Sequence, residues 1–74
     1  MLEKLKEYFE MEYKETKELL EKKPSWCQPK EVVSNSIQRC LGVAQFVQSV
    51  GVKYEDLDCY EEIREKLENL LREV

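Results

Sequence analysis

At 74 residues the chain has room for one small domain, and a core of this size gives only modest stability. Hydrophobic residues make up 42% of it and Gly and Pro are few, which fits a compact helical domain and argues against a disordered chain. The net charge is −4, concentrated in residues 54–74, which hold eight acids and three bases. No basic stripe is present, so binding to nucleic acid is not expected.

The first segment predicts a helix over residues 2–22. Its inward positions recur at spacings of three and four, the pattern of one helix face: Leu2, Leu5, Phe9, Tyr13, Thr16 and Leu20. Pro24 predicts the stop, because the residue before a proline avoids the helical region. The charged start resembles no signal peptide, and no run reaches the roughly 18 apolar residues of a membrane span. We therefore expect a cytoplasmic protein with no membrane partner.

The second segment predicts a helix over residues 29–50. Pro29 suits the first helical position and Gly51 suits the position after the last turn. Apolar residues form an arc that covers about half of the helical wheel, so we expect this helix to be central and the most buried. The apolar arc consists of Val32, Val33, Ile37, Cys40, Leu41, Val43, Ala44, Val47 and Val50, and Phe46 widens it. The many Val residues leave a strand over 43–52 as the weaker alternative. We expect Trp26, just before this helix, to fold back over one end of the domain.

The third segment predicts a helix over residues 56–73. Asp58 and Glu61 form a capping pair by spacing, and apolar residues follow at intervals of three and four: Tyr60, Ile63, Leu67, Leu70 and Val74. Short connections make neighbouring helices antiparallel. The sequence thus predicts an all-α fold, a small antiparallel three-helix bundle that forms a single domain over residues 1–74.

Catalytic and metal chemistry find little support in the residue types present. The chain has no His that could activate a nucleophile. Its three cysteines, Cys27, Cys40 and Cys59, are isolated and odd in number, so we expect free thiols and neither a zinc site nor a disulfide scaffold. We expect no enzyme activity, cofactor or small-molecule substrate. Glu12 and Arg39 lie at the margins of two apolar faces, where they fit an ion pair between helices.

Cys59 is the candidate reactive thiol. It falls in the first turn of the third predicted helix, and a helix N-terminus lowers the pKa of a thiol. Its acidic neighbours Asp58 and Glu61 act in the opposite direction.

An uncharged stripe on the second predicted helix is the candidate contact face. It lies away from the apolar arc and consists of Ser34, Gln38, Gly42, Gln45 and Ser49. Exposed faces elsewhere in the chain are rich in Glu and Lys, and depletion of charge is typical of the centre of a protein interface. A glycine in mid-helix costs about 1 kcal/mol relative to alanine, which favours close approach by another backbone at Gly42.

These patterns favour a small non-catalytic protein-interaction module, either a homodimer or an accessory subunit of a larger complex. Two alternatives use nucleic-acid biology: a nucleic-acid-associated regulator, or an acidic decoy that occupies a nucleic-acid-binding protein through residues 54–74. A third alternative is a thiol switch that uses Cys59. The sequence does not identify the partner.

Overall fold

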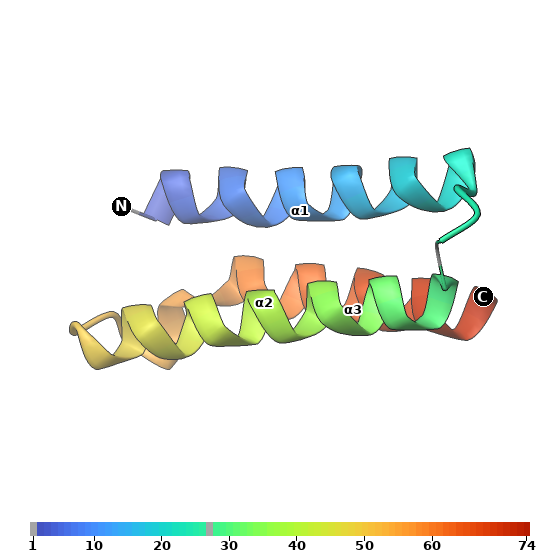
Figure 1. Cartoon of the computed structure of the whole chain (residues 1–74). Coiled ribbons are helices and arrows are strands. Elements are labelled where there is room, and N and C mark those ends of the chain that lie inside the picture. Colours follow the sequence, from blue (N-terminus) through green and yellow to red (C-terminus); the bar gives the residue numbers. More distant parts are fainter. Residues whose placement is uncertain (1, 27) are drawn as a thin grey trace.

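The computed structural model describes residues 2–26 and 28–74, which form three α-helices joined by short connections. Helix α1 covers Leu2–Lys22, α2 covers Pro29–Ser49 and α3 covers Asp58–Glu73, with a 3-10 turn, η1, at Tyr54–Asp56. The predicted all-α fold of three helices is confirmed, and the alternative strand over 43–52 is wrong because α2 continues through most of that range. The chain doubles back at each connection, so its two ends lie at opposite ends of a molecule 41 Å long (Figure 1).

The helix ends follow local backbone rules. Lys23 adopts a left-handed conformation with φ of 47°, and its N–H donates to the carbonyl of Leu19, which closes α1 just before Pro24. At the end of α2, Gly51 has φ of 109° and the Val52 N–H donates to the Val47 carbonyl at 3.0 Å. This Schellman closure requires the left-handed conformation that glycine adopts without strain.

The start of α3 differs from the prediction. Asp58 is the first residue of the helix instead of its N-cap, and Leu57 occupies the cap position with no side-chain hydrogen bond. Glu61 does not close a capping pair; its carboxylate accepts a hydrogen bond of 2.6 Å from the Tyr54 hydroxyl. The 3-10 turn at Tyr54–Asp56, which the sequence pattern did not predict, places the tyrosine over the first turn of α3.

The hydrophobic core draws on all three helices, and each helix packs against the other two. Its fully buried centre includes Phe9 of α1, whose ring lies 5.9 Å from that of Tyr60 in α3. Leu57, just before α3, is also fully buried. Helix α1 contributes four buried residues, α2 five and α3 three. Burial is therefore shared, and the expectation that the second helix is the most buried stays a prediction.

Helix α2 is rotated slightly from the register expected from its apolar residues. Its core stripe, the set of positions that face the interior, comprises Val33, Ser36, Cys40, Ala44 and Val47. Ile37 and Leu41 are only half-buried, because the core centre lies on the side of Ser36. Phe46, expected within the apolar arc, is 66% exposed, and Val50 is exposed as well. Trp26 does not fold back over the domain either, since 70% of its surface remains accessible.

Within the described part of the chain, none of the helices combines the length and the hydropathy that a bilayer crossing requires.

Candidate functional site

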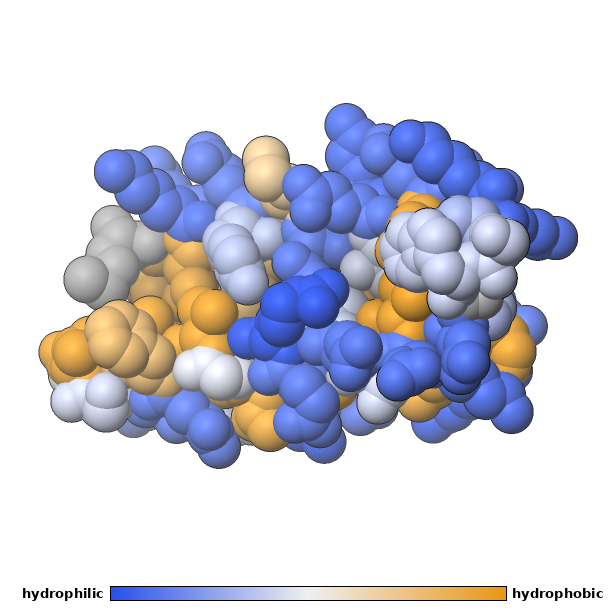
Figure 2. Space-filling view, viewed as in Figure 1, coloured by the Kyte–Doolittle hydropathy of each residue, from blue (hydrophilic) through white to orange (hydrophobic). Residues whose placement is uncertain are grey.

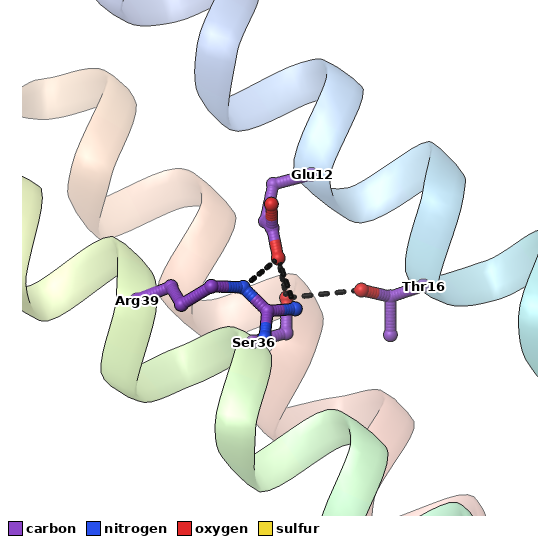
Figure 3. Close-up of polar contacts among 4 residues, drawn as sticks. All are labelled: Glu12, Thr16, Ser36 and Arg39. Atoms are coloured by element: carbon purple, nitrogen blue, oxygen red, sulfur yellow. Dashed lines mark hydrogen bonds and ion pairs between the residues drawn. The ribbon is translucent and has the colours of Figure 1, made fainter. Parts of the chain in front are cut away.

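A polar cluster with three buried members and the half-exposed Arg39 joins the middle of α1 to the middle of α2 (Figure 3). It comprises Glu12 and Thr16 of α1 and Ser36 and Arg39 of α2. One carboxylate oxygen of Glu12, Oε1, accepts hydrogen bonds from Arg39 Nε at 2.7 Å and from the Ser36 hydroxyl at 3.1 Å. The Ser36 oxygen in turn accepts a hydrogen bond of 3.0 Å from Thr16. The predicted ion pair between Glu12 and Arg39 is confirmed.

The cluster behaves as a structural element between the helices. Ser36 is wholly buried and Glu12 is only 9% exposed, so both need partners inside the protein. Among the described residues, no buried side-chain nitrogen or oxygen lacks a hydrogen-bond partner. The buried polar atoms of the cluster are therefore satisfied by one another, and none of them is left for a ligand. The sequence signal for Ser36 was available but weak: a serine three residues after Val33 and four before Cys40 occupies a core position by spacing.

Neither described cysteine is placed as a reactive thiol. Burial, with a smaller contribution from the nearby Glu12 carboxylate, raises the pKa of the Cys40 thiol to about 11. Burial also raises the pKa of Cys59. The negative charges of Glu62 and Asp58 raise this pKa as well. Backbone N–H groups at the start of α3 lower the Cys59 pKa, as a helix N-terminus should, but the net shift is upward. These shifts weigh against the thiol-switch hypothesis, while Cys27 lies outside the described residues.

The surroundings of Cys59 are acidic. It lines a shallow depression of about 280 Å³ at the N-terminal ends of α1 and α3, together with Asp56, Asp58 and Glu62. Despite these acids, no group of three or more His, Cys, Asp or Glu in residues 2–26 and 28–74 is arranged to hold a metal ion. The exposed acids of α3, which the decoy hypothesis would use, continue along the helix through Glu61 and Glu65.

The uncharged stripe lies entirely on the outward face of α2. All five of its residues are exposed, on the side of the helix opposite the core stripe: Ser34, Gln38, Gly42, Gln45 and Ser49. Arg39, the one charged residue between Val32 and Val52, is held by Glu12 of α1 at the border of this face. The structure therefore brings together every residue predicted for the contact face and leaves it without a charge of its own.

Gly42 has no explanation within the described part of the chain. A Cβ atom added there would meet no atom within 4 Å, apart from the backbone of its own helix. Its backbone is helical, so no left-handed conformation requires a glycine either. Alanine would fit this position and would favour the helix by about 1 kcal/mol. The missing side chain thus serves neither the packing nor the backbone of the isolated chain.

Apolar side chains border the uncharged stripe at one end. Phe46 and Val50, one turn apart near the end of α2, are both exposed. Figure 2 shows apolar surface at the end of the molecule where α2 finishes and again at the opposite end, whereas the surface of α1 in this view is mostly hydrophilic. Exposed aromatic and aliphatic side chains next to an uncharged face are the composition expected at the centre of a protein contact.

Comparison of the chain with protein-family models, with curated proteins and with solved structures finds no match.

Proposed function

We propose that this protein is a small non-catalytic interaction module that binds another protein chain through the outward face of α2. We infer the same face for both forms of the hypothesis, a homodimer and an accessory subunit of a larger complex. The site of action we propose is the cytoplasm, where thiols such as Cys40 and Cys59 stay reduced.

One observation carries this proposal: from Ser34 to Ser49, over about four turns, the outward face of α2 carries no charge, in a chain whose other surfaces are highly charged. Over the 21 residues from Val32 to Val52, the single charged side chain is Arg39, which forms an ion pair with Glu12. Charged residues make up 38% of the chain as a whole. On a helix face that contacts only water, Glu and Lys improve solubility and are better helix formers than Ser and Gly. Their exclusion supports a surface that loses its water on binding.

The exposed Phe46 and the unexplained Gly42 support the same face independently. Phe46 leaves 66% of an aromatic side chain in water, and aromatic residues are enriched where interfaces are most strongly stabilised. Gly42 allows a partner backbone to come close to the helix axis. The two residues lie one helical turn apart, so one partner element can cover both.

Site-specific cross-linking tests this proposal. A photoreactive amino acid replaces Gln45 on the uncharged stripe in the full chain, in the cells that produce it, and replaces Glu65 on the exposed face of α3 as the matched control. We expect a discrete adduct from position 45, with a mass that reports either a second copy or another protein. We expect little or no adduct from position 65.

Adducts from position 65 alone would contradict the proposal and would favour the acidic decoy, whose contact face is α3. An absence of adducts from position 45, in a variant that retains its helical circular dichroism, would contradict it as well.

A further inference from the structure

We propose that the partner of the uncharged stripe is a second copy of this chain, packed with its α2 antiparallel to the first about a two-fold axis close to Gly42. This inference rests on the proposed function and deepens it, because it names the partner and the register of the contact.

The order of residues along the stripe carries the inference. Read in either direction, the stripe has the same residue types, Ser–Gln–Gly–Gln–Ser, with Gly42 at the centre. Ser34 and Ser49 lie eight and seven residues from the glycine, and Gln38 and Gln45 lie four and three residues from it. A two-fold interface requires a surface that is complementary to itself, in which residue i meets residue j and residue j meets residue i. Two antiparallel copies of this stripe fulfil that condition.

The pairings that result are chemically consistent. Gln38 of one copy faces Gln45 of the other, twice, and each side-chain amide has both a donor and an acceptor for its counterpart. Ser34 faces Ser49 at both ends, where short side chains leave the helices room to approach. The two Gly42 residues meet close to the axis, where the absence of a side chain lets the two helix backbones come close together. The single chain offers no such explanation for this glycine.

Charge argues for the same occupant. Each copy carries a net charge of −4, so two copies repel one another over most orientations. Between Ser34 and Ser49, two copies can bring their outward α2 faces together without opposing like charges, because Arg39, the charged residue of that range, is paired with Glu12. A strongly basic partner would instead be drawn to the acids of α3.

The area available sets the expected strength. Helix α2 has 21 residues and is therefore about 31 Å long and about 10 Å wide. Its outward face is smaller than the roughly 800 Å² per partner of a standard stable interface, which would be about one seventh of the 5502 Å² surface of the chain. The pairing should therefore be reversible, with dissociation in the micromolar range.

Two double variants test the pairing and its direction. Both change only exposed positions and introduce good helix formers, so the folded chain should be retained. In Gln38→Glu/Gln45→Glu, antiparallel pairing opposes two glutamates at each of two sites, and we expect dimerisation to weaken about tenfold or more. In Gln38→Glu/Gln45→Lys, the same pairing sets glutamate against lysine twice, and we expect the affinity of the wild type or a few-fold tighter binding. Parallel helices would oppose like charges in both variants.

Sedimentation of the full-length wild type and both variants across micromolar concentrations is the measurement, with circular dichroism to confirm equal helicity. A wild-type monomer throughout that range would overturn the second-copy inference, although a hetero-adduct from position 45 would leave the proposed function standing. Equal weakening in both double variants would overturn the antiparallel register. A dimer that neither variant weakens would place the interface elsewhere and, without a cross-link from position 45, would overturn the proposed function too.

Discussion

The two opposite faces of α2 carry stripes of five residues each, with similar spacing but different chemistry. The core stripe has four apolar residues and one buried polar residue, Ser36, which is fully hydrogen-bonded. The uncharged stripe has only polar residues and glycine, and all of them are exposed. The interior therefore tolerates a polar group because its partners are in the same chain. The uncharged stripe avoids charge although it is exposed, as the proposed contact with another chain would require.

The sharpest test of this comparison places the same substitution on adjacent residues. Ala44 of the core stripe is 3% exposed, whereas Gln45 of the uncharged stripe is exposed. Ala44→Glu would bury a charge without a partner and should lower the free energy of unfolding by about 4 kcal/mol or more, enough to unfold a domain of this size. Gln45→Glu should change it by about 0.5 kcal/mol or less. Urea denaturation of dilute protein gives both values, and similar losses would contradict the assignment of the two faces.

The pH dependence of stability sharpens the description of the core stripe. Burial raises the pKa of Cys40 from its ordinary value of 9.0 to about 11. The unfolded chain therefore loses the thiol proton first. The contribution of the protonated Cys40 thiol to the free energy of unfolding is therefore complete below about pH 9. It declines by about 1.4 kcal/mol for each pH unit as the pH rises from about 9 to about 11.

Denaturation from pH 8 to 11 should show this loss in the wild type and a shallower slope in Cys40→Ala, which has no thiol to titrate. Identical slopes in the two proteins would mean that another group controls the alkaline transition.

The polar cluster predicts an effect of intermediate size. Arg39→Ala removes the charged partner of Glu12 and should lower the free energy of unfolding by about 1–2 kcal/mol, since Glu12 retains only the Ser36 hydroxyl. Arg72→Ala is the matched control, because Arg72 is exposed and contacts only the exposed Asn69 by hydrogen bond in the described structure. It should cost about 0.5 kcal/mol or less. Thermal melts of both variants provide the measurement, and equal stabilities would show that the ion pair adds nothing.

Gly42→Ala should have the smallest effect on the single chain and separates stability from association. An added methyl group meets no described atom beyond its own helix, so alanine should raise the unfolding free energy of the dilute monomer by about 0.5–1 kcal/mol. The same methyl group should obstruct close approach at the two-fold axis and weaken dimerisation. Denaturation at low concentration and sedimentation at high concentration measure the two effects. Stronger association in the alanine variant would exclude a close crossing at Gly42.

The sequence predicted the larger elements of this molecule because they depend on local rules. Pro29 and Gly51 mark the ends of α2, and the spacing of residues such as Phe9 and Leu67 specifies the inward faces of α1 and α3. The residues of the uncharged stripe share one exposed face for the same reason, since periodicity alone determines it.

Features that depend on contacts between segments were harder to predict. The burial of Ser36 reflects the positions of Glu12 and Thr16 on another helix, so hydrophobicity along α2 alone shifted the expected core toward Ile37 and Leu41. The exposure of Phe46 likewise follows from that rotation. The capping pair of Asp58 and Glu61 did not form because Tyr54, which the 3-10 turn carries into position, bonds to the glutamate.

The single carboxylate oxygen that receives both Arg39 and Ser36 has a consequence for how this sequence can vary. Losing Arg39 or Ser36 leaves the buried Glu12 carboxylate with fewer hydrogen bonds, whereas replacing the set with apolar residues of similar volume can be nearly neutral. Positions 12, 36 and 39 should therefore change together in any lineage that keeps this fold. A lineage that has lost the acid should have filled position 36 with Ala or Val and released position 39 to vary freely, and such joint substitution would be visible in sequences alone.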